Sequence, residues 1–148
     1  PQSLLDAGSG RGVFLLPFLC AFPGVPVTSV DLLPYRAQLW SDIRLGGVGA
    51  LNALQGDIRF FAAPEGSFDV VTLLEVLEHI PEVEAAVNNA VRLAGRYVVV
   101  TVPSKPDNNP EHVHLLTKEK LTALFTAAGC GRLRFGGVNG HLTLIAAK

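Results

Sequence analysis

Short β-type runs alternate along the chain with segments whose apolar residues recur at helical spacing. The β-type runs are residues 3–7, 25–30, 50–55, 68–75 and 96–102. Such alternation is typical of an α/β fold, in which helices cover a parallel sheet. The run "FDVVTLLE" (residues 68–75) is apolar at nearly every position after Asp69, which indicates a central strand buried on both faces.

Helical segments separate these runs, and a hairpin is expected to end the chain. Helices are predicted over residues 11–22 and 35–45, from Pro81 to Gly95, and from a Thr117 cap to Gly129. Pro17 lies inside the first of them and is expected to remove a backbone hydrogen bond and bend the helix. Near the C-terminus, "RLRF" and "HLTLIAA" flank "GGVNG", whose Asn-Gly pair predicts a turn between two antiparallel strands.

Composition narrows the class of protein. A chain of 148 residues with 49% hydrophobic residues fits one domain, and we expect residues 1–148 to form it. The formal net charge of -1 and the absence of a Lys or Arg run argue against a nucleic-acid partner. Of the two longest apolar stretches, residues 13–30 are interrupted by prolines and residues 97–102 are too few to cross a bilayer. No membrane span is therefore expected.

Cysteine usage and the first residue give two further expectations. Cys20 and Cys130 lack metal or redox spacing and are interpreted as free thiols in a reducing compartment, which predicts a cytoplasmic location. The sequence starts at Pro1, two residues before the first β-type run, and contains no Met. We therefore expect these residues to belong to a longer chain with a segment upstream.

The first chemical motif is "LLDAGSGRG", residues 4–12. Glycines after the first strand of such a sheet let the backbone approach a ligand closely, beside a helix N-terminus. The spacing is G-x-G-x-G, so Val13 stands where the dinucleotide pattern has its third glycine. The carboxylate of Asp6 would repel a pyrophosphate and attract an ammonium or sulfonium group. A cationic nucleoside therefore fits this motif better than a dinucleotide does.

Two further acids follow the next β-type runs. Asp31 ends the second run in "VTSVDLLP", where a carboxylate can accept hydrogen bonds from a ribose diol and Leu32 can cover an adenine face. Asp57, in "LQGDI", follows the third run and can accept from an exocyclic amino group, with Ile58 as an apolar wall. The alternative for both acids is ordinary turn chemistry.

Together these motifs resemble a known family. "LLDAGSGRG", "VTSVDLLP", "LQGDI" and "FDVVTLLEVLEHIPE" resemble, in order and distance, the class I S-adenosylmethionine (SAM)-dependent methyltransferases over residues 3–147. The resemblance implies a single doubly wound sheet of seven strands in the order 3-2-1-4-5-7-6, mostly parallel with an antiparallel last strand and helices on both faces. It also implies SAM as the cofactor, bound along Asp6, Gly8, Ser9, Gly10, Asp31, Leu32, Asp57, Ile58 and Glu75.

Candidate catalytic residues lie after the fourth and fifth β-type runs. Methyl transfer from a sulfonium requires alignment and, for some acceptors, removal of a proton. The candidates are Glu75, His79 and His112. Alternation in "HVHLL" predicts that His114 shares a face with His112, while His141 in the last run is expected to be structural.

Three hypotheses follow for the function. The leading one is methyl transfer from SAM to an oxygen or nitrogen of a small-molecule or glycan- or lipid-linked acceptor, without a metal. In the second, Glu75, Glu78, His79 and His112 hold Mn or Mg, because "EVLEH" resembles more weakly the metal-assisted methyltransferases of the 3′-terminal ribose 2′-hydroxyl of RNA. Their Asn-rich and aromatic segment has no match here. The third is a domain that binds SAM without catalysis. The oligomeric state is not indicated.

Overall fold

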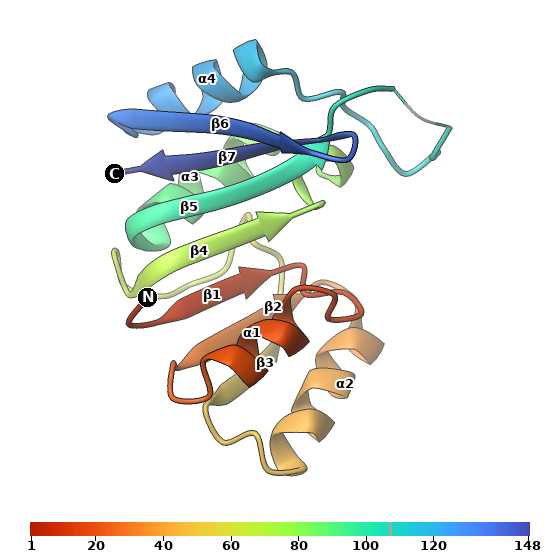
Figure 1. Ribbon diagram of the computed structural model, residues 1–148, viewed down its shortest axis with the longest axis vertical. Coiled ribbons are helices and arrows are strands. Elements are labelled where there is room, and N and C mark those ends of the chain that lie inside the picture. The colour runs from red at the N-terminus through yellow and green to blue at the C-terminus, as the bar shows by residue number, and fades with distance from the viewer. Residues whose placement is uncertain (107) are drawn as a thin grey trace.

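Seven strands form one sheet in the order β3-β2-β1-β4-β5-β7-β6 (Figure 1). The computed structural model describes residues 1–106 and 108–148. Its elements are β1 (Leu4–Ala7), α1 (Leu15–Ala21), β2 (Val27–Asp31), α2 (Pro34–Leu45), β3 (Leu51–Gln55), β4 (Phe68–Leu74), the 3-10 helix η1 (Leu77–His79), α3 (Val83–Leu93), β5 (Ala94–Pro103), α4 (Lys118–Ala127), β6 (Arg132–Val138) and β7 (His141–Ala147).

Strand directions confirm the expected topology. The five strands β3, β2, β1, β4 and β5 are parallel to one another, each pairing with the next in this order. β7 is antiparallel to both β5 and β6. Asn139 and Gly140 form the turn before β7 with φ angles of 45° and 87°, the left-handed backbone that an Asn-Gly hairpin turn requires. The carboxyl ends of β1 to β5 and the start of β7 therefore meet at one edge of the sheet.

The first helix starts later than its apolar pattern predicts. α1 begins at Leu15 and not at residue 11. Leu16 N–H donates to the Gly12 carbonyl and Phe18 N–H donates to the Phe14 carbonyl. Pro17, between these donors, has no N–H and occupies the first turn of α1, where a helix tolerates proline. The helix therefore starts two residues before Pro17 instead of passing through it from residue 11. The prediction that Pro17 removes a hydrogen bond from the middle of the helix is wrong.

The boundary between α3 and β5 also differs from the prediction. α3 starts at Val83, two residues after Pro81, and ends at Leu93. Ala94, expected on the helix face, is the first residue of β5 and pairs in register with Phe68. A buried alanine suits both a helix face and an inward strand position, so periodicity alone did not separate the two.

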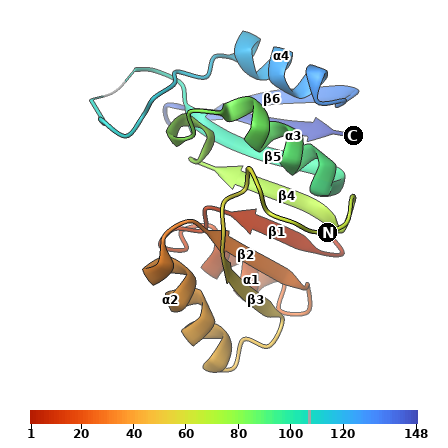
Figure 2. The ribbon, with the colours of Figure 1, turned by 180° about the vertical axis from the view of Figure 1, so that it is seen from behind.

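Helices cover both faces of the sheet, as Figures 1 and 2 show from opposite sides. α1 and α2 pack on the β1–β3 half of one face, where the core contains Leu4, Leu15, Leu19, Val27, Trp40 and Leu51. α3 and α4 pack on the other face, over a larger core that includes Leu73, Val87, Val100, Leu121 and Phe125. None of the helices in the described ranges is long and apolar enough to cross a membrane. Both cysteines are free thiols, Cys20 exposed and Cys130 buried.

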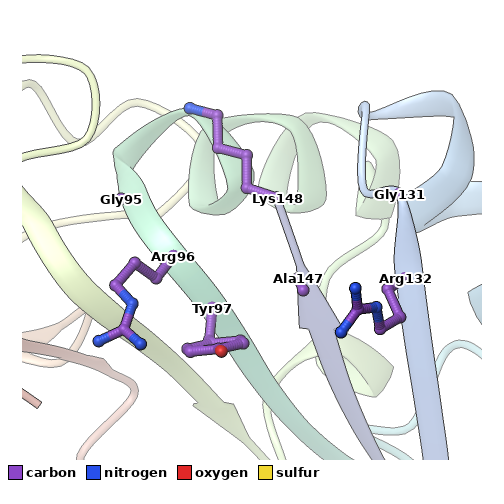
Figure 3. Close-up of a pocket in the computed structure, with 7 residues that line it drawn as sticks. All are labelled: Gly95, Arg96, Tyr97, Gly131, Arg132, Ala147 and Lys148. Atoms are coloured by element: carbon purple, nitrogen blue, oxygen red, sulfur yellow. The ribbon is translucent and has the colours of Figure 1, made fainter.

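Two adjoining hollows lie between β5, β7 and β6 and are distinct from the candidate site. The first has a volume of about 430 Å³ and is lined by Gly95, Arg96, Tyr97, Gly131, Arg132, Ala147 and Lys148 (Figure 3). The second, of about 400 Å³, shares Tyr97, Arg132 and Ala147 with it. Because β5 begins and the antiparallel β7 ends there, both hollows lie toward the end of the sheet opposite the glycine motif.

Candidate active site

The glycine motif forms a tight turn directly after β1. Gly8, Gly10 and Gly12 have φ angles of 78°, 53° and 83°, a region that residues with a Cβ rarely adopt. A Cβ on Gly8 would lie 2.5 Å from Val76 Cγ2, and one on Gly12 would lie 2.4 Å from Trp40 Cη2. The turn is therefore packed between the segment after β4 and the core beneath α2, and at these two positions only glycine fits.

Asp31 ties this turn to the end of β2. Its carboxylate is 3% exposed; Oδ2 accepts the Gly10 N–H and Oδ1 accepts the Leu33 N–H, each at 3.0 Å. Arg36 Nη1 lies 3.9 Å from Oδ2. Each carboxylate oxygen offers more than one lone pair, so the oxygens retain capacity for a ligand hydroxyl. The acid predicted for ribose binding is held in place before any ligand arrives.

Asp6 is buried beneath the turn. Its Oδ1 accepts the Thr72 hydroxyl at 2.6 Å, and its main-chain carbonyl accepts the Ser9 hydroxyl. Burial raises the pKa of Asp6, and the Thr72 hydrogen bond acts against that shift. Ser9 Oγ lies 2.7 Å from Ser29 Oγ, so its hydroxyl faces into the fold. A positive charge near the turn would favour the ionised form of Asp6.

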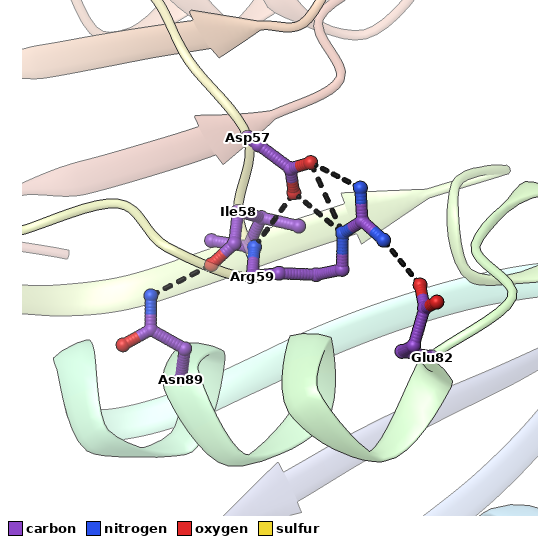
Figure 4. A network of polar contacts seen from close by, with 5 residues as sticks. All are labelled: Asp57, Ile58, Arg59, Glu82 and Asn89. Atoms are coloured by element: carbon purple, nitrogen blue, oxygen red, sulfur yellow. Dashed lines mark hydrogen bonds and ion pairs between the residues drawn. The ribbon is translucent and has the colours of Figure 1, made fainter.

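Asp57 is already engaged by a residue that sequence reasoning missed. Arg59 donates from Nε to both carboxylate oxygens, from Nη2 to Oδ2 and from its main-chain N–H to Oδ1, and its Nη1 bonds Glu82 (Figure 4). The Arg59 side chain lowers the pKa of Asp57. The Asn89 amide donates to the Ile58 carbonyl at 2.6 Å and fixes this segment on α3. The available signal was an arginine two residues after the acid in "GDIR".

The two apolar residues expected beside the adenine lie in different environments. Leu32 is 60% exposed at the sheet edge. Ile58 is buried and belongs to the core cluster with Val30 and Leu73. The side chain of Ile58 is therefore a core residue, and Leu32 has the exposure that a wall of a ligand site needs.

Glu75 follows β4 in a strained conformation. Its φ is 56°, and its N–H donates to the Thr101 carbonyl at 3.0 Å. Its Oε2 lies 3.0 Å from His141 Nδ1, so the histidine expected to be structural contacts a candidate catalytic residue. Since Val76 contacts the position of Gly8, Glu75 stands next to the glycine turn. Glu75 thus connects the predicted cofactor residues with the C-terminal hairpin.

A second cluster combines Glu78, His79 and His112. One ligand atom from each lies within 4.8 Å of the others, and Glu78 is buried. The Nδ1 of His79 faces the Glu111 carbonyl at 3.2 Å, and its Nε2 lies 3.9 Å from Glu78 Oε1. Glu75 is not part of this group. The structure thus brings together three of the four residues of the metal alternative, whereas Glu75 follows β4 at a positive φ and contacts His141.

His114 does not join that cluster. Its Nε2 bonds the Pro81 carbonyl at 3.0 Å, whereas the His112 ring meets the His79 ring edge-on with centroids 4.7 Å apart. The N–H groups of Val113 and His114 both donate to the Glu78 carbonyl, which fixes this segment on η1. The predicted alternation holds in the burial of the segment, where His112 and His114 are partly buried and Val113 and Leu115 are exposed, although only His112 contacts His79.

Comparisons with known proteins agree with this arrangement. The family model described as a methyltransferase domain matches residues 1–133. A ubiquinone biosynthesis O-methyltransferase of Xanthomonas oryzae is 38% identical over 96 residues, covering 61% of this chain and 37% of that protein. The ribosomal RNA small subunit methyltransferase G of Lactococcus lactis is 28% identical over 151 residues, covering 82% of this chain and 63% of that protein.

Among solved structures, a SAM-dependent methyltransferase from Aquifex aeolicus aligns with a TM-score of 0.76 at 20% identity. The alignment covers 99% of this chain and 81% of that chain, and it shows a shared fold. The chain spans 37% of the length of the Xanthomonas relative. The match of the family model, the strand order and the glycine turn between buried carboxylates lead to one conclusion: the chain belongs to the SAM-dependent methyltransferase family.

Proposed function

We propose that this chain binds SAM at the carboxyl edge of β1, β2 and β3 and transfers the methyl group to an oxygen or nitrogen of a small-molecule or glycan- or lipid-linked acceptor. The observation that carries this proposal is Asp31, a buried carboxylate that accepts the N–H of Gly10 at 3.0 Å. It joins the glycine turn to the end of β2, where a ribose diol would be recognised.

Each group of the cofactor then has a residue of matching chemistry. Asp6, whose pKa is raised by burial, gains from a nearby sulfonium because an opposite charge favours the carboxylate. Asp31 accepts from the ribose hydroxyls, and the exposed Leu32 covers the adenine. Asp57 accepts from the adenine amino group while Arg59 holds the carboxylate. Gly8 and Gly10 leave room for the cofactor, and the main chains of Ser9, Ile58 and Glu75 complete the binding surface.

The chain's own residues do little covalent chemistry in this mechanism. When bound, SAM supplies a methyl group already activated by the sulfonium. The protein holds the acceptor in line with that methyl group and excludes water, which accounts for most of the rate enhancement in such a displacement. The acceptor would lie beside Glu75, His79 and His112, which follow β4 and β5 at the same edge. The two free thiols support a reducing, cytoplasmic location for this reaction.

A specific observation also favours a second candidate function, metal-assisted methylation of an RNA ribose. Glu78, His79 and His112 offer one carboxylate and two imidazoles within 4.8 Å, a donor set that suits Mn and related divalent ions. Bonds of about 2.1 Å would bring the ligand atoms to roughly 3 to 3.5 Å, so the side chains must close slightly. The rRNA methyltransferase relative supports this candidate. This second candidate would be favoured over small-molecule methylation by two results together. Mn should bind to the wild type and not to His79→Ala, and the rate of methyl transfer should depend on added Mn.

Calorimetric titration with SAM and S-adenosylhomocysteine (SAH) tests the leading proposal. We expect micromolar binding to the wild type, strong loss of binding in Asp31→Ala, and unchanged binding in Asp42→Ala, a control acid of α2 that is exposed and whose carboxylate accepts from the Gln38 amide. NADH should not bind. Tight binding of SAM without methyl transfer to any acceptor in a lysate would instead identify a non-catalytic SAM-binding domain. Absence of SAM and SAH binding would reject the proposal.

A further inference from the structure

We propose that His141 is the general base of the methyl transfer, that Glu75 positions it, and that the acceptor group is therefore a hydroxyl. This inference rests on the proposed function and narrows its acceptor class. The central observation is the 3.0 Å contact between His141 Nδ1 and Glu75 Oε2 at the same edge of the sheet as the glycine turn.

Topology brings these two residues together. Glu75 follows β4, and His141 begins β7, which is antiparallel to β5 with His141 opposite Pro103. A strand begins where its antiparallel neighbour ends. His141 therefore lies at the edge of the sheet where the parallel strands, β5 among them, have their carboxyl ends. Its side chain is 47% exposed and that of Glu75 is 38% exposed. The imidazole is therefore accessible to an acceptor, while the carboxylate is partly covered.

Backbone contacts hold both partners. The Glu75 N–H donates to the Thr101 carbonyl at 3.0 Å, and the Ser104 N–H and hydroxyl donate to the Gly140 carbonyl at 2.9 and 2.6 Å. The φ of 56° at Glu75 is an unfavourable conformation for a residue with a Cβ, which indicates that the surrounding structure imposes it. Oε1 of Glu75 is buried with no hydrogen-bond partner among the described residues. Among the described residues, the ion pair of this carboxylate is therefore its contact with His141 through Oε2.

Glu75 follows β4 next to the glycine turn, where the methyl donor is proposed to bind. Val76, the residue after Glu75, approaches Gly8 so closely that a Cβ there would lie 2.5 Å from Val76 Cγ2. β4 is also the direct neighbour of β1 in the sheet. His79 is less suited to the role, because its Nδ1 faces the Glu111 carbonyl and its Nε2 lies 3.9 Å from Glu78 Oε1. His141 combines exposure with a carboxylate partner, Glu75, whose next residue Val76 approaches the glycine turn.

The chemistry of the pair selects a hydroxyl acceptor. With Nδ1 at 3.0 Å from Glu75 Oε2, the carboxylate favours the tautomer that carries its proton on Nδ1, which leaves the Nε2 lone pair to accept a proton. The hydroxyl proton moves to Nε2 as the oxygen forms its bond to the methyl carbon. The bond between methyl carbon and sulfur breaks, and its electron pair stays on sulfur as a thioether. The resulting imidazolium is stabilised by Glu75 and returns its proton to solvent. A hydroxyl needs this proton removal, which typically contributes 10² to 10⁴ in rate.

Nuclear magnetic resonance of the histidine rings tests the geometry. In the wild type with saturating SAH, long-range proton–nitrogen correlations should show His141 protonated at Nδ1 and shifted relative to the free protein. Glu75→Gln should shift the population toward protonation at Nε2, because the amide can donate to Nδ1. Glu65→Gln, which removes a surface carboxylate bonded to Lys148, should leave the tautomer unchanged. His141→Gln assigns the signals.

Transfer of radioactive methyl groups from SAM to acceptors in a lysate tests the chemistry. We expect His141→Gln to lower the rate by about 10² to 10⁴ with unchanged SAH affinity, and the labelled products to be methyl ethers. The inference is overturned if His141 is protonated at Nε2 in the wild type, if SAH leaves its ring signals unmoved, or if His141→Gln transfers at the wild-type rate. Failure of SAH to bind, or of the wild type to transfer any methyl group, would instead reject the proposed function on which it rests.

Discussion

The two sides of the candidate site hold their polar groups in different ways. On the cofactor side, formed by the glycine turn with Asp6, Asp31 and Asp57, each carboxylate accepts a hydrogen bond of 3.0 Å or shorter from the protein. On the acceptor side, formed by Glu75, Glu78, His79, His112 and His141, the rings of His79 and His141 are 36% and 47% exposed. In the proposed roles, the carboxylates that bind the cofactor are held before it arrives, whereas the rings of His79 and His141 remain accessible to an acceptor.

The difference follows from the lengths of the connecting segments. On the cofactor side, polar residues sit at or within a few residues of a strand end, where register fixes their positions. On the acceptor side, a long segment connects β5 to α4. Within it, the main-chain N–H groups of Val113 and His114 donate to the Glu78 carbonyl in η1. Functional variation in an α/β fold is concentrated in such loops. We therefore expect substitutions on the cofactor side to change stability and cofactor affinity, and those on the acceptor side to change turnover.

The largest effect is expected from filling the glycine turn. Gly12→Ala places a Cβ 2.4 Å from Trp40 Cη2 at a φ of 83°, and Trp40 is fully buried in the core. Overpacking and backbone strain together should lower the free energy of unfolding by about 2 to 4 kcal/mol. Gly24→Ala is the control, since no atom lies within 4 Å of the new Cβ. Urea denaturation measures both; equal stability of the two variants would contradict the described turn.

Cofactor affinity should separate the two sides next. Asp31→Ala removes a buried charged acceptor, and each hydrogen bond to such a group contributes about 1.5 to 3 kcal/mol, so the SAH dissociation constant should rise about 100-fold. His79→Ala, on the acceptor side, should change it less than about threefold, a free-energy difference well below 1 kcal/mol. Calorimetry gives both values. A large loss of affinity in His79→Ala would show that the two sides are not separate in function.

The strain at Glu75 offers a sharper test within the acceptor side. Glu75→Gly and Glu75→Ala both remove the carboxylate, so their difference isolates the φ of 56°. Glycine tolerates this conformation, and the glycine variant should be more stable by about 1 kcal/mol. At Glu84, an exposed acid inside helix α3, the same pair should differ in the opposite direction by about 0.5 kcal/mol. Thermal or urea unfolding that gives the same sign at both positions would exclude strain at Glu75.

The sequence carried enough information for the cofactor side because its residues are local. The glycine spacing and the acids at strand ends each lie within a short motif, and the structure gives them the expected edge of the sheet. The contact of Glu75 with His141 depends on the order of β4, β5 and β7, so no local pattern contains it. Arg59 was missed for a different reason. Its hold on Asp57 depends on side-chain conformation and on Glu82 from a distant segment.

The smallest expected effect concerns the ion pair of Arg59 with Asp57, and it is measured as the pH dependence of stability to urea. Because Arg59 lowers the pKa of Asp57, the pair stabilises the fold above the ordinary aspartate value of about 3.9, and this contribution is lost as pH falls through the lowered value. Arg59→Met should therefore lower the urea midpoint slightly at pH 7, where partly exposed ion pairs contribute little, and less at pH 3. Glu82 also loses its partner in this variant. Arg44→Met, in the last turn of α2, is the control. Its difference in urea midpoint from the wild type should be the same at pH 7 and at pH 3. If the difference in urea midpoint between the wild type and Arg59→Met is the same at pH 7 and at pH 3, Arg59 acts on the cofactor side by packing and not by charge.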